Sequence, residues 1–160
     1  MIQMTSPIEM RCFQGKATMI VCVETLCNGR PQGNVFNPYL PEGIPFSGID
    51  GLVLCVNRIC DKINYPQAAF ELRSLTKNRV AEPKRITEES GNMLLDQSLL
   101  LAQHGKHGTL SITVLYRQHG GLQGQIVMNR GQRLRKRCFR SGLELMALLD
   151  EAFPISSADQ

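Results

Sequence analysis

The densest group of residues that could do chemistry is the segment 130–140, with the sequence RGQRLRKRCFR. Alternate side chains of a β-strand point to the same face, so Arg133, Arg135 and Arg137 would form a row. Such a row suits the phosphates of a nucleic acid or another anionic partner. The alternative is an edge strand whose charges keep it from pairing with other chains. The basic residues of the segment are Arg130, Arg133, Arg135, Lys136, Arg137 and Arg140.

The histidines and cysteines do not form a recognisable metal or catalytic site. His104, His107 and His119 could bind zinc together with thiolates, but the chain has no Cys-x-x-Cys pair. Cys138 has basic neighbours and no identifiable histidine or carboxylate partner, so a cysteine-dependent enzyme is only a third hypothesis. No glycine-rich phosphate loop is present. We therefore expect no catalytic residue, no metal and no cofactor.

The composition is typical of a globular protein. Of the 160 residues, 42% are hydrophobic and 20% are charged, and the formal net charge of +4 is low for a dedicated nucleic-acid binder. No stretch of ~18 apolar residues predicts a membrane span, and the N-terminus does not resemble a signal peptide. We expect a cytoplasmic protein whose six cysteines are free thiols.

The C-terminal part of the chain predicts three antiparallel strands followed by a helix. Residues 109–116, TLSITVLY, alternate between apolar and polar, which is typical of a half-buried strand. Turn residues separate this strand from 123–128, and a second polar connection leads to 133–139. The segment 141–153 then changes to helical spacing, with Ser141 as N-cap.

The N-terminal part resembles this unit. Residues 17–37 align with 108–128 without a gap, and the Gln-Gly pair at 32–33 matches that at 123–124. An apolar stripe over 49–63 predicts a helix in the corresponding place. Between them, PYLPEGIPF holds three prolines, so we expect it to replace the third strand. Glycine at a strand start permits a bulge or a close backbone crossing, and the glutamine amide can satisfy turn backbone groups.

These patterns predict an α+β fold of two tandem strand-plus-helix units, with antiparallel sheets and the helices packed on one face. We expect extra helices in the middle, at 65–75 and 91–105. The predicted organisation is a first unit at 1–76, a connecting segment at 77–89 and a second unit at 90–160, together one compact domain.

Residues 90–153 contain the pattern YRQ, then QG, then FRSxLELxxLxDEA. This pattern resembles that of a group of small bacterial proteins of the Firmicutes type for which no function is established. The resemblance implies no activity. Leu122 stands where the group is expected to have tryptophan, so a binding surface supported by that tryptophan would be altered here. The shared pattern comprises Tyr116, Arg117, Gln118, Gln123, Gly124, Phe139, Arg140, Ser141, Leu143, Glu144, Leu145, Asp150, Glu151 and Ala152.

The preferred hypothesis is a non-enzymatic protein-interaction or regulatory module whose partner is another protein or a second copy. It depends on the absence of a site and on the strand edges that open sheets leave exposed. The alternative is nucleic-acid or other anion binding through 130–140, and no membrane partner is expected. The candidate interaction surface comprises Gln32, Arg117, Gln118, Leu122 and Gln123.

Overall fold

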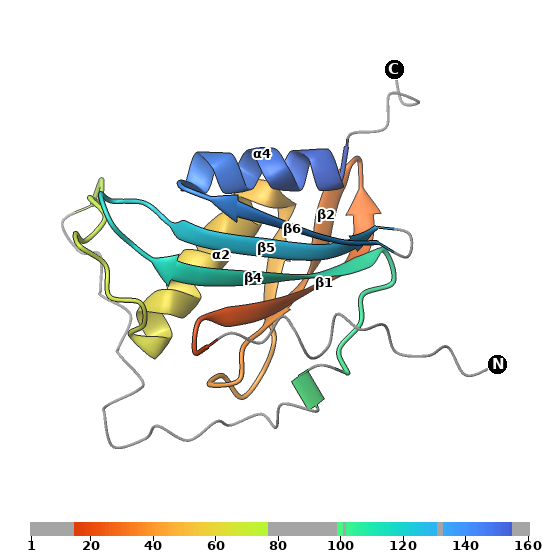
Figure 1. Ribbon diagram of the computed structural model, residues 1–160, viewed down its shortest axis with the longest axis horizontal. Helices are drawn as coiled ribbons and strands as arrows, with labels where there is room; N and C mark the ends of the chain where they lie inside the picture. Colours follow the sequence, from red (N-terminus) through yellow and green to blue (C-terminus); the bar gives the residue numbers. More distant parts are fainter. Residues whose placement is uncertain (1–14, 77–98, 101, 131–132, 155–160) are drawn as a thin grey trace.

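The computed structural model describes residues 15–76, 99–100, 102–130 and 133–154. In this part of the chain, six strands form one antiparallel sheet with two helices, which is an α+β fold (Figure 1). The strand order is β3-β2-β1-β4-β5-β6. The first half supplies β1 (Thr18–Cys27), β2 (Arg30–Phe36), β3 (Ile44–Ser47) and α2 (Gly48–Ile63). The second half supplies β4 (Gly108–Tyr116), β5 (Gln123–Arg130), β6 (Arg133–Phe139) and α4 (Gly142–Ala152).

The two halves share a single sheet, whereas the sequence predicted separate sheets. β1 and β4 pair antiparallel, from Thr18 opposite Thr113 to Val23 opposite Gly108. Both strands are largely apolar, and pairing them satisfies the backbone groups that two open sheets would expose. Within the described residues, only β3 and β6 are therefore left as edge strands.

Each half contains a hairpin with the same irregularity next to its Gln-Gly pair. One residue of the first strand, Glu24 or Leu115, has no partner in the register and forms a bulge. Both hairpins also have two consecutive residues at positive φ: Asn28 and Gly29 in the first, His119 and Gly120 in the second. The flanking pairs are Val23–Gly33 and Thr25–Gln32 in the first hairpin, and Val114–Gly124 and Tyr116–Gln123 in the second.

The two Gly residues of the Gln-Gly pairs allow the neighbouring strand to approach closely. A Cβ on Gly33 would lie 1.8 Å from the carbonyl oxygen of Cys22, and one on Gly124 would lie 2.0 Å from that of Thr113. No side chain fits at such distances, so both positions require glycine.

A third strand is present in the first half, where the sequence predicted none. β3 lies within the PYLPEGIPF segment and its flanking serine, and Pro45 pairs with Asn34 of β2. Because β3 is an edge strand, it can accommodate a residue that donates no ladder hydrogen bond. The prediction therefore overlooked that proline is tolerated at a sheet edge.

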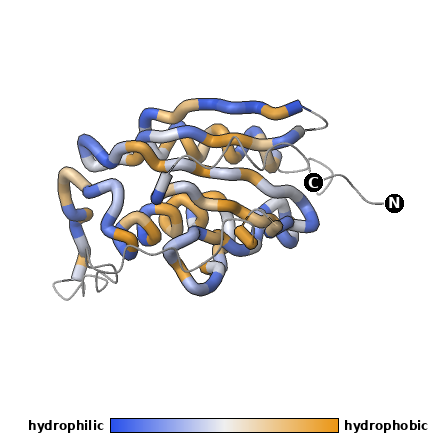
Figure 2. The backbone as a smooth tube through the Cα atoms, turned by 60° about the horizontal axis from the view of Figure 1, so that its bottom comes forward, coloured by the Kyte–Doolittle hydropathy of each residue, from blue (hydrophilic) through white to orange (hydrophobic). Residues whose placement is uncertain are grey.

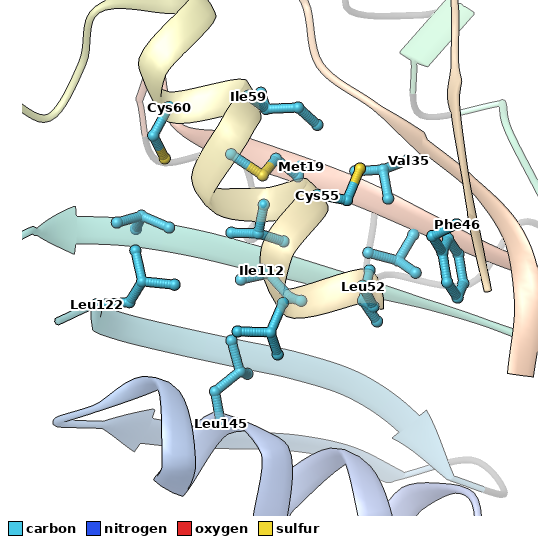
Figure 3. Packing of buried hydrophobic residues seen from close by; sticks show 14 of the residues in the cluster. Met19, Val35, Phe46, Leu52, Cys55, Ile59, Cys60, Ile112, Leu122 and Leu145 are labelled. Atoms are coloured by element: carbon cyan, nitrogen blue, oxygen red, sulfur yellow. The ribbon is translucent and has the colours of Figure 1, made fainter. Parts of the chain in front are cut away.

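The main core lies between the sheet and the two helices. The predicted apolar stripe of α2 is confirmed, and α4 buries Leu145 and Leu149 in the same cluster as Met19 and Ile112 (Figure 3). We call this side of the sheet the helix face. Ser141 caps α4 as predicted, because its Oγ accepts a hydrogen bond from the backbone N–H of Glu144 at 3.1 Å.

The opposite side of the sheet, which we call the far face, is also buried at its centre. Leu100 packs there against Ile20 and Cys22. Ser111 is only 1% exposed, and the hydroxyls of Thr18 and Thr113 lie 3.0 Å apart. The prediction that 109–116 is half-buried is therefore wrong at its centre, where both faces are covered.

The extra middle helices were the weakest part of the prediction. Residues 65–75 are not helical: Ala68 bridges to Arg117, and the N–H of Ala69 donates to the Arg117 carbonyl. In the predicted helix 91–105, residues 99–100 are helical and residues 102–105 are not, while the part up to residue 98 lies outside the described residues. The predicted connecting segment at 77–89 also lies outside them.

Candidate functional site

The strand β6 is the open, basic edge of the sheet. It pairs with β5 on one side, from Phe139 opposite Gly124 to Arg133 opposite Arg130, and no described strand pairs with its other side. In an antiparallel edge strand, about half of the backbone N–H and C=O groups point away from the neighbour. All the residues from Arg133 to Cys138 are exposed. Figure 2 shows β6 as a mostly hydrophilic strand beside the more apolar β5.

The register with β5 determines which side chains share a face. Arg135 and Arg137 lie opposite Met128 and Ile126, which pack in or against the main core. Directly paired residues point to the same side of an antiparallel sheet, so Arg133, Arg135 and Arg137 project on the helix face. We call these three residues the arginine row. The intervening side chains, Leu134, Lys136 and Cys138, project on the far face.

The arginine row is not neutralised by the described carboxylates. Within the described part of the chain, no carboxylate oxygen lies within 4.0 Å of Arg133, Arg135 or Arg137. Arg137 instead donates through Nη1 to the backbone carbonyl of Lys136 at 3.0 Å. The strand therefore combines free backbone groups with positive charges that an anionic partner could satisfy.

Arg140 does not belong to this row. Its guanidinium donates to Glu144 through Nη2 at 2.9 Å and through Nε at 3.3 Å, and its backbone N–H donates to the same carboxylate at 2.6 Å. These hydrogen bonds lower the pKa of Glu144 and raise that of Arg140. The side chain of Arg130 lies outside the described part, so the described candidate anion site is the arginine row with Lys136.

Phe139 fixes the end of β6 to the sheet. Its ring lies over Gly124, where a Cβ would be 2.9 Å from the ring atom Cζ, and its side chain is buried. An aromatic ring across from a strand glycine covers the backbone that the glycine leaves bare. The same pairing occurs in the first half, where Phe46 lies opposite Gly33.

Two of the three glutamines of the predicted interaction surface, Gln32 and Gln123, support the hairpins. The side-chain amide of Gln123 accepts from the N–H of Gln118 at 2.8 Å and donates to its carbonyl at 3.0 Å. Gln32 accepts from the hydroxyl of Thr25 at 3.4 Å and donates to that of Ser47 at 3.3 Å. These amides are already engaged within the molecule, as expected for a structural role.

Arg117, also predicted for that surface, is 5% exposed. Its Nε donates to the carbonyl of Pro66 at 2.6 Å, and its Nη1 donates to Asp61 at 2.5 Å and to Asn57 at 3.3 Å. The side chain thus ties the segment after α2 to the helix. Sequence reasoning missed this role because the partners are more than fifty residues away.

Leu122 is 5% exposed and belongs to the main core, so it contributes no surface (Figure 3). Leu122 lies in the connection between β4 and β5, and its side chain belongs to the same core cluster as residues of both helices. Of the five residues of the predicted surface, only Gln118 is exposed, while Gln32 and Gln123 are partly buried. The structure therefore does not gather these residues into one accessible patch.

The buried thiols are poorly suited to nucleophilic chemistry. Burial raises the pKa of Cys22 and of Cys55 to about 11 and that of Cys60 to about 12, which keeps the thiols protonated. Cys27 and Cys138 are exposed. Among the described residues, no three His, Cys, Asp or Glu side chains group as metal ligands.

Neither described helix is long and apolar enough to cross a membrane. Comparisons with protein-family models, curated proteins and solved structures found no match to this chain. The resemblance to the Firmicutes-type proteins therefore stays a prediction.

Proposed function

We propose that this protein is an interaction module that binds an extended, acidic segment of a partner protein along β6. The single observation that carries the proposal is the combination, on one edge strand, of exposed basic side chains and backbone groups that no other described strand pairs with. A strand added to this edge would satisfy the backbone groups, and its carboxylates would satisfy the charges.

The same charges argue against a second copy as the occupant. Two β6 strands pairing edge to edge would bring their basic side chains against one another, and like charges opposite each other destabilise a sheet. An acidic strand meets no such repulsion. The basic residues thus exclude one partner and favour the other.

A nucleic acid is the second candidate, because the arginine row could contact successive phosphates. Two observations favour the peptide. Lys136 projects on the opposite face from the row, so no single face presents all four charges. The aromatic ring of the strand, Phe139, is buried and cannot stack on bases.

The two candidates separate in one titration experiment. A fluorescent acidic peptide, with aspartates alternating with threonines, and a fluorescent mixed-sequence oligonucleotide are each titrated with the protein and followed by anisotropy. We expect the peptide to bind and the triple variant R133S/R135S/R137S to lose that binding. The matched control is R58S/R73S/K106S, which removes three exposed basic residues elsewhere and should bind like the wild type.

Three outcomes contradict the peptide proposal. They are no binding of the peptide, equal loss in both triple variants, or binding of the oligonucleotide alone. In the last case, sensitivity to the R133S/R135S/R137S change and steep weakening between about 50 and about 200 mM salt would establish the nucleic-acid alternative.

We also propose that the two halves are copies of one duplicated unit. The shared bulge, the shared positive-φ turn and the two Gly–Phe pairs support this. The β1–β4 register supports it as well. In the alignment of the two halves, Thr18 corresponds to Thr109 and Cys22 corresponds to Thr113. Thr18 pairs with Thr113, and their counterparts Thr109 and Cys22 pair with each other in the same register. Copies related by a twofold axis would pair in this way.

The duplication is tested by replacing residues 24–33 with the sequence of residues 115–124. If the hairpins are equivalent, the chimera should unfold cooperatively in a thermal melt followed by circular dichroism. Loss of the cooperative transition would contradict the equivalence.

A further inference from the structure

We infer that the segment bound by β6 carries acidic side chains at every second position. This inference rests on the proposed function and specifies the chemistry of the partner. The arginine row provides three positive charges on the helix face, separated by one residue each. Alternate residues along a strand are about 6.6–6.8 Å apart. An added strand has the same repeat, so three alternating carboxylates would each face one arginine.

The far face of β6 sets a different requirement. There the exposed side chains alternate as Leu134, Lys136 and Cys138, and Leu134 is 47% exposed. Intervening residues of the partner would lie beside these side chains. Uncharged residues of high strand propensity, such as threonine or valine, fit beside Leu134 and Cys138.

Glu144 limits the acidic run at one end of the site. Its carboxylate is held at the end of β6 by the side chain and the backbone N–H of Arg140. A further partner carboxylate beyond Arg137 would meet Arg140, whose positive charge Glu144 already neutralises. The acidic positions are therefore confined to the span of the arginine row, which gives the pattern acidic-x-acidic-x-acidic.

The spacing is tested with two peptides of identical composition, one with aspartates alternating with threonines and one with the aspartates in a continuous block. We expect the alternating peptide to bind about two- to four-fold more tightly, because a continuous block of three aspartates points one of them away from the arginine row and loses one cross-strand pair worth a fraction of a kcal/mol. Equal binding of both peptides would overturn the alternating pattern while leaving acidic-strand binding intact. Failure of both peptides to bind would refute the proposed function itself.

The face assignment is tested by charge reversal. Arg135→Glu should weaken binding of the alternating peptide, and a peptide with lysine at the central acidic position should restore it. Lys136→Glu is the matched control, because it makes the same charge change on the far face. If the lysine peptide rescues Lys136→Glu as well as Arg135→Glu, the assignment of the acidic positions to the helix face is overturned.

Discussion

The two edge strands of the described sheet limit pairing with other strands in different ways. β3 is a strand of four residues that contains Pro45, and a short strand with proline offers little for another strand to pair with. β6 is a strand of seven residues without proline, and it is protected only by its charges. A short edge with proline discourages every partner, whereas a charged edge discourages only partners that are not acidic. This difference suggests that β6 is the edge on which a partner is selected.

Apart from their edge strands, the two halves share the features that their hairpins need in order to fold. Both halves need the bulge, the close approach at glycine and the phenylalanine opposite that glycine. None of these features requires a basic edge. The arginine row is therefore a feature of the second half that the shared framework does not require.

The shared glycines provide the largest expected effect. We predict that Gly33→Ala and Gly124→Ala each lower the free energy of unfolding by about 3 kcal/mol, because the new Cβ would overlap a backbone carbonyl. Chemical denaturation measures this change. The control is Gly51→Ala in α2, where a Cβ meets nothing within 4 Å, and it should stabilise by up to about 1 kcal/mol. A large loss at one of the two strand glycines alone would break the comparison.

The second effect distinguishes two ion pairs. Arg117→Met should cost about 2 kcal/mol of unfolding free energy, since it leaves the buried carbonyl of Pro66 without its donor. Arg30 in the first half pairs with Asp50 at 3.2 Å, and both side chains are more than half exposed. Arg30→Met should therefore cost less than about 1 kcal/mol. Equal losses of unfolding free energy in the two variants would show that the buried Arg117 contacts stabilise the fold no more than the exposed Arg30 pair.

The smallest effect compares the two helix caps. Ser141 accepts a hydrogen bond from the N–H of Glu144, whereas the side chain of Ser47 makes no cap hydrogen bond to α2. We predict that Ser141→Ala costs about 1 kcal/mol and that Ser47→Ala costs a few tenths, measured by thermal unfolding. If Ser47→Ala lowers the stability more than Ser141→Ala does, the cap hydrogen bond does not account for the difference between the two helix starts.

Local patterns predicted most of the elements. The alternation in β4, the apolar stripe of α2 and the Ser141 cap each follow from residues close together in sequence, and each was predicted correctly. The Gln-Gly pairs indicated a bulge or a close approach of the backbone, and both features occur beside each pair. These features depend on backbone sterics and burial, which a short segment largely specifies.

The failures involve distant partners, except for β3, which was missed because its proline was taken to exclude a strand. Residues 65–75 were predicted to form a helix with Pro66 in its first turn, yet Arg117, which follows β4, hydrogen-bonds the backbone of Pro66 and Ala69. The alternation in 109–116 places Tyr116 on the same face as Leu110, Ile112 and Val114, but the bulge leaves it 58% exposed. The joining of β1 to β4 and the burial of Leu122 likewise depend on tertiary packing. At the candidate site, the sequence predicted both an arginine row and a charged edge strand, and the strand order places β6 at the edge of the described sheet.

The most direct test of acidic-strand binding at β6 is amide hydrogen exchange measured by NMR, with and without saturating alternating acidic peptide. If the peptide adds a strand to β6, the amides of β6 that point away from β5 should exchange more slowly on binding, while those of β3 should not change. Bound peptide without added protection in β6, or with protection in β3 instead, would contradict the account.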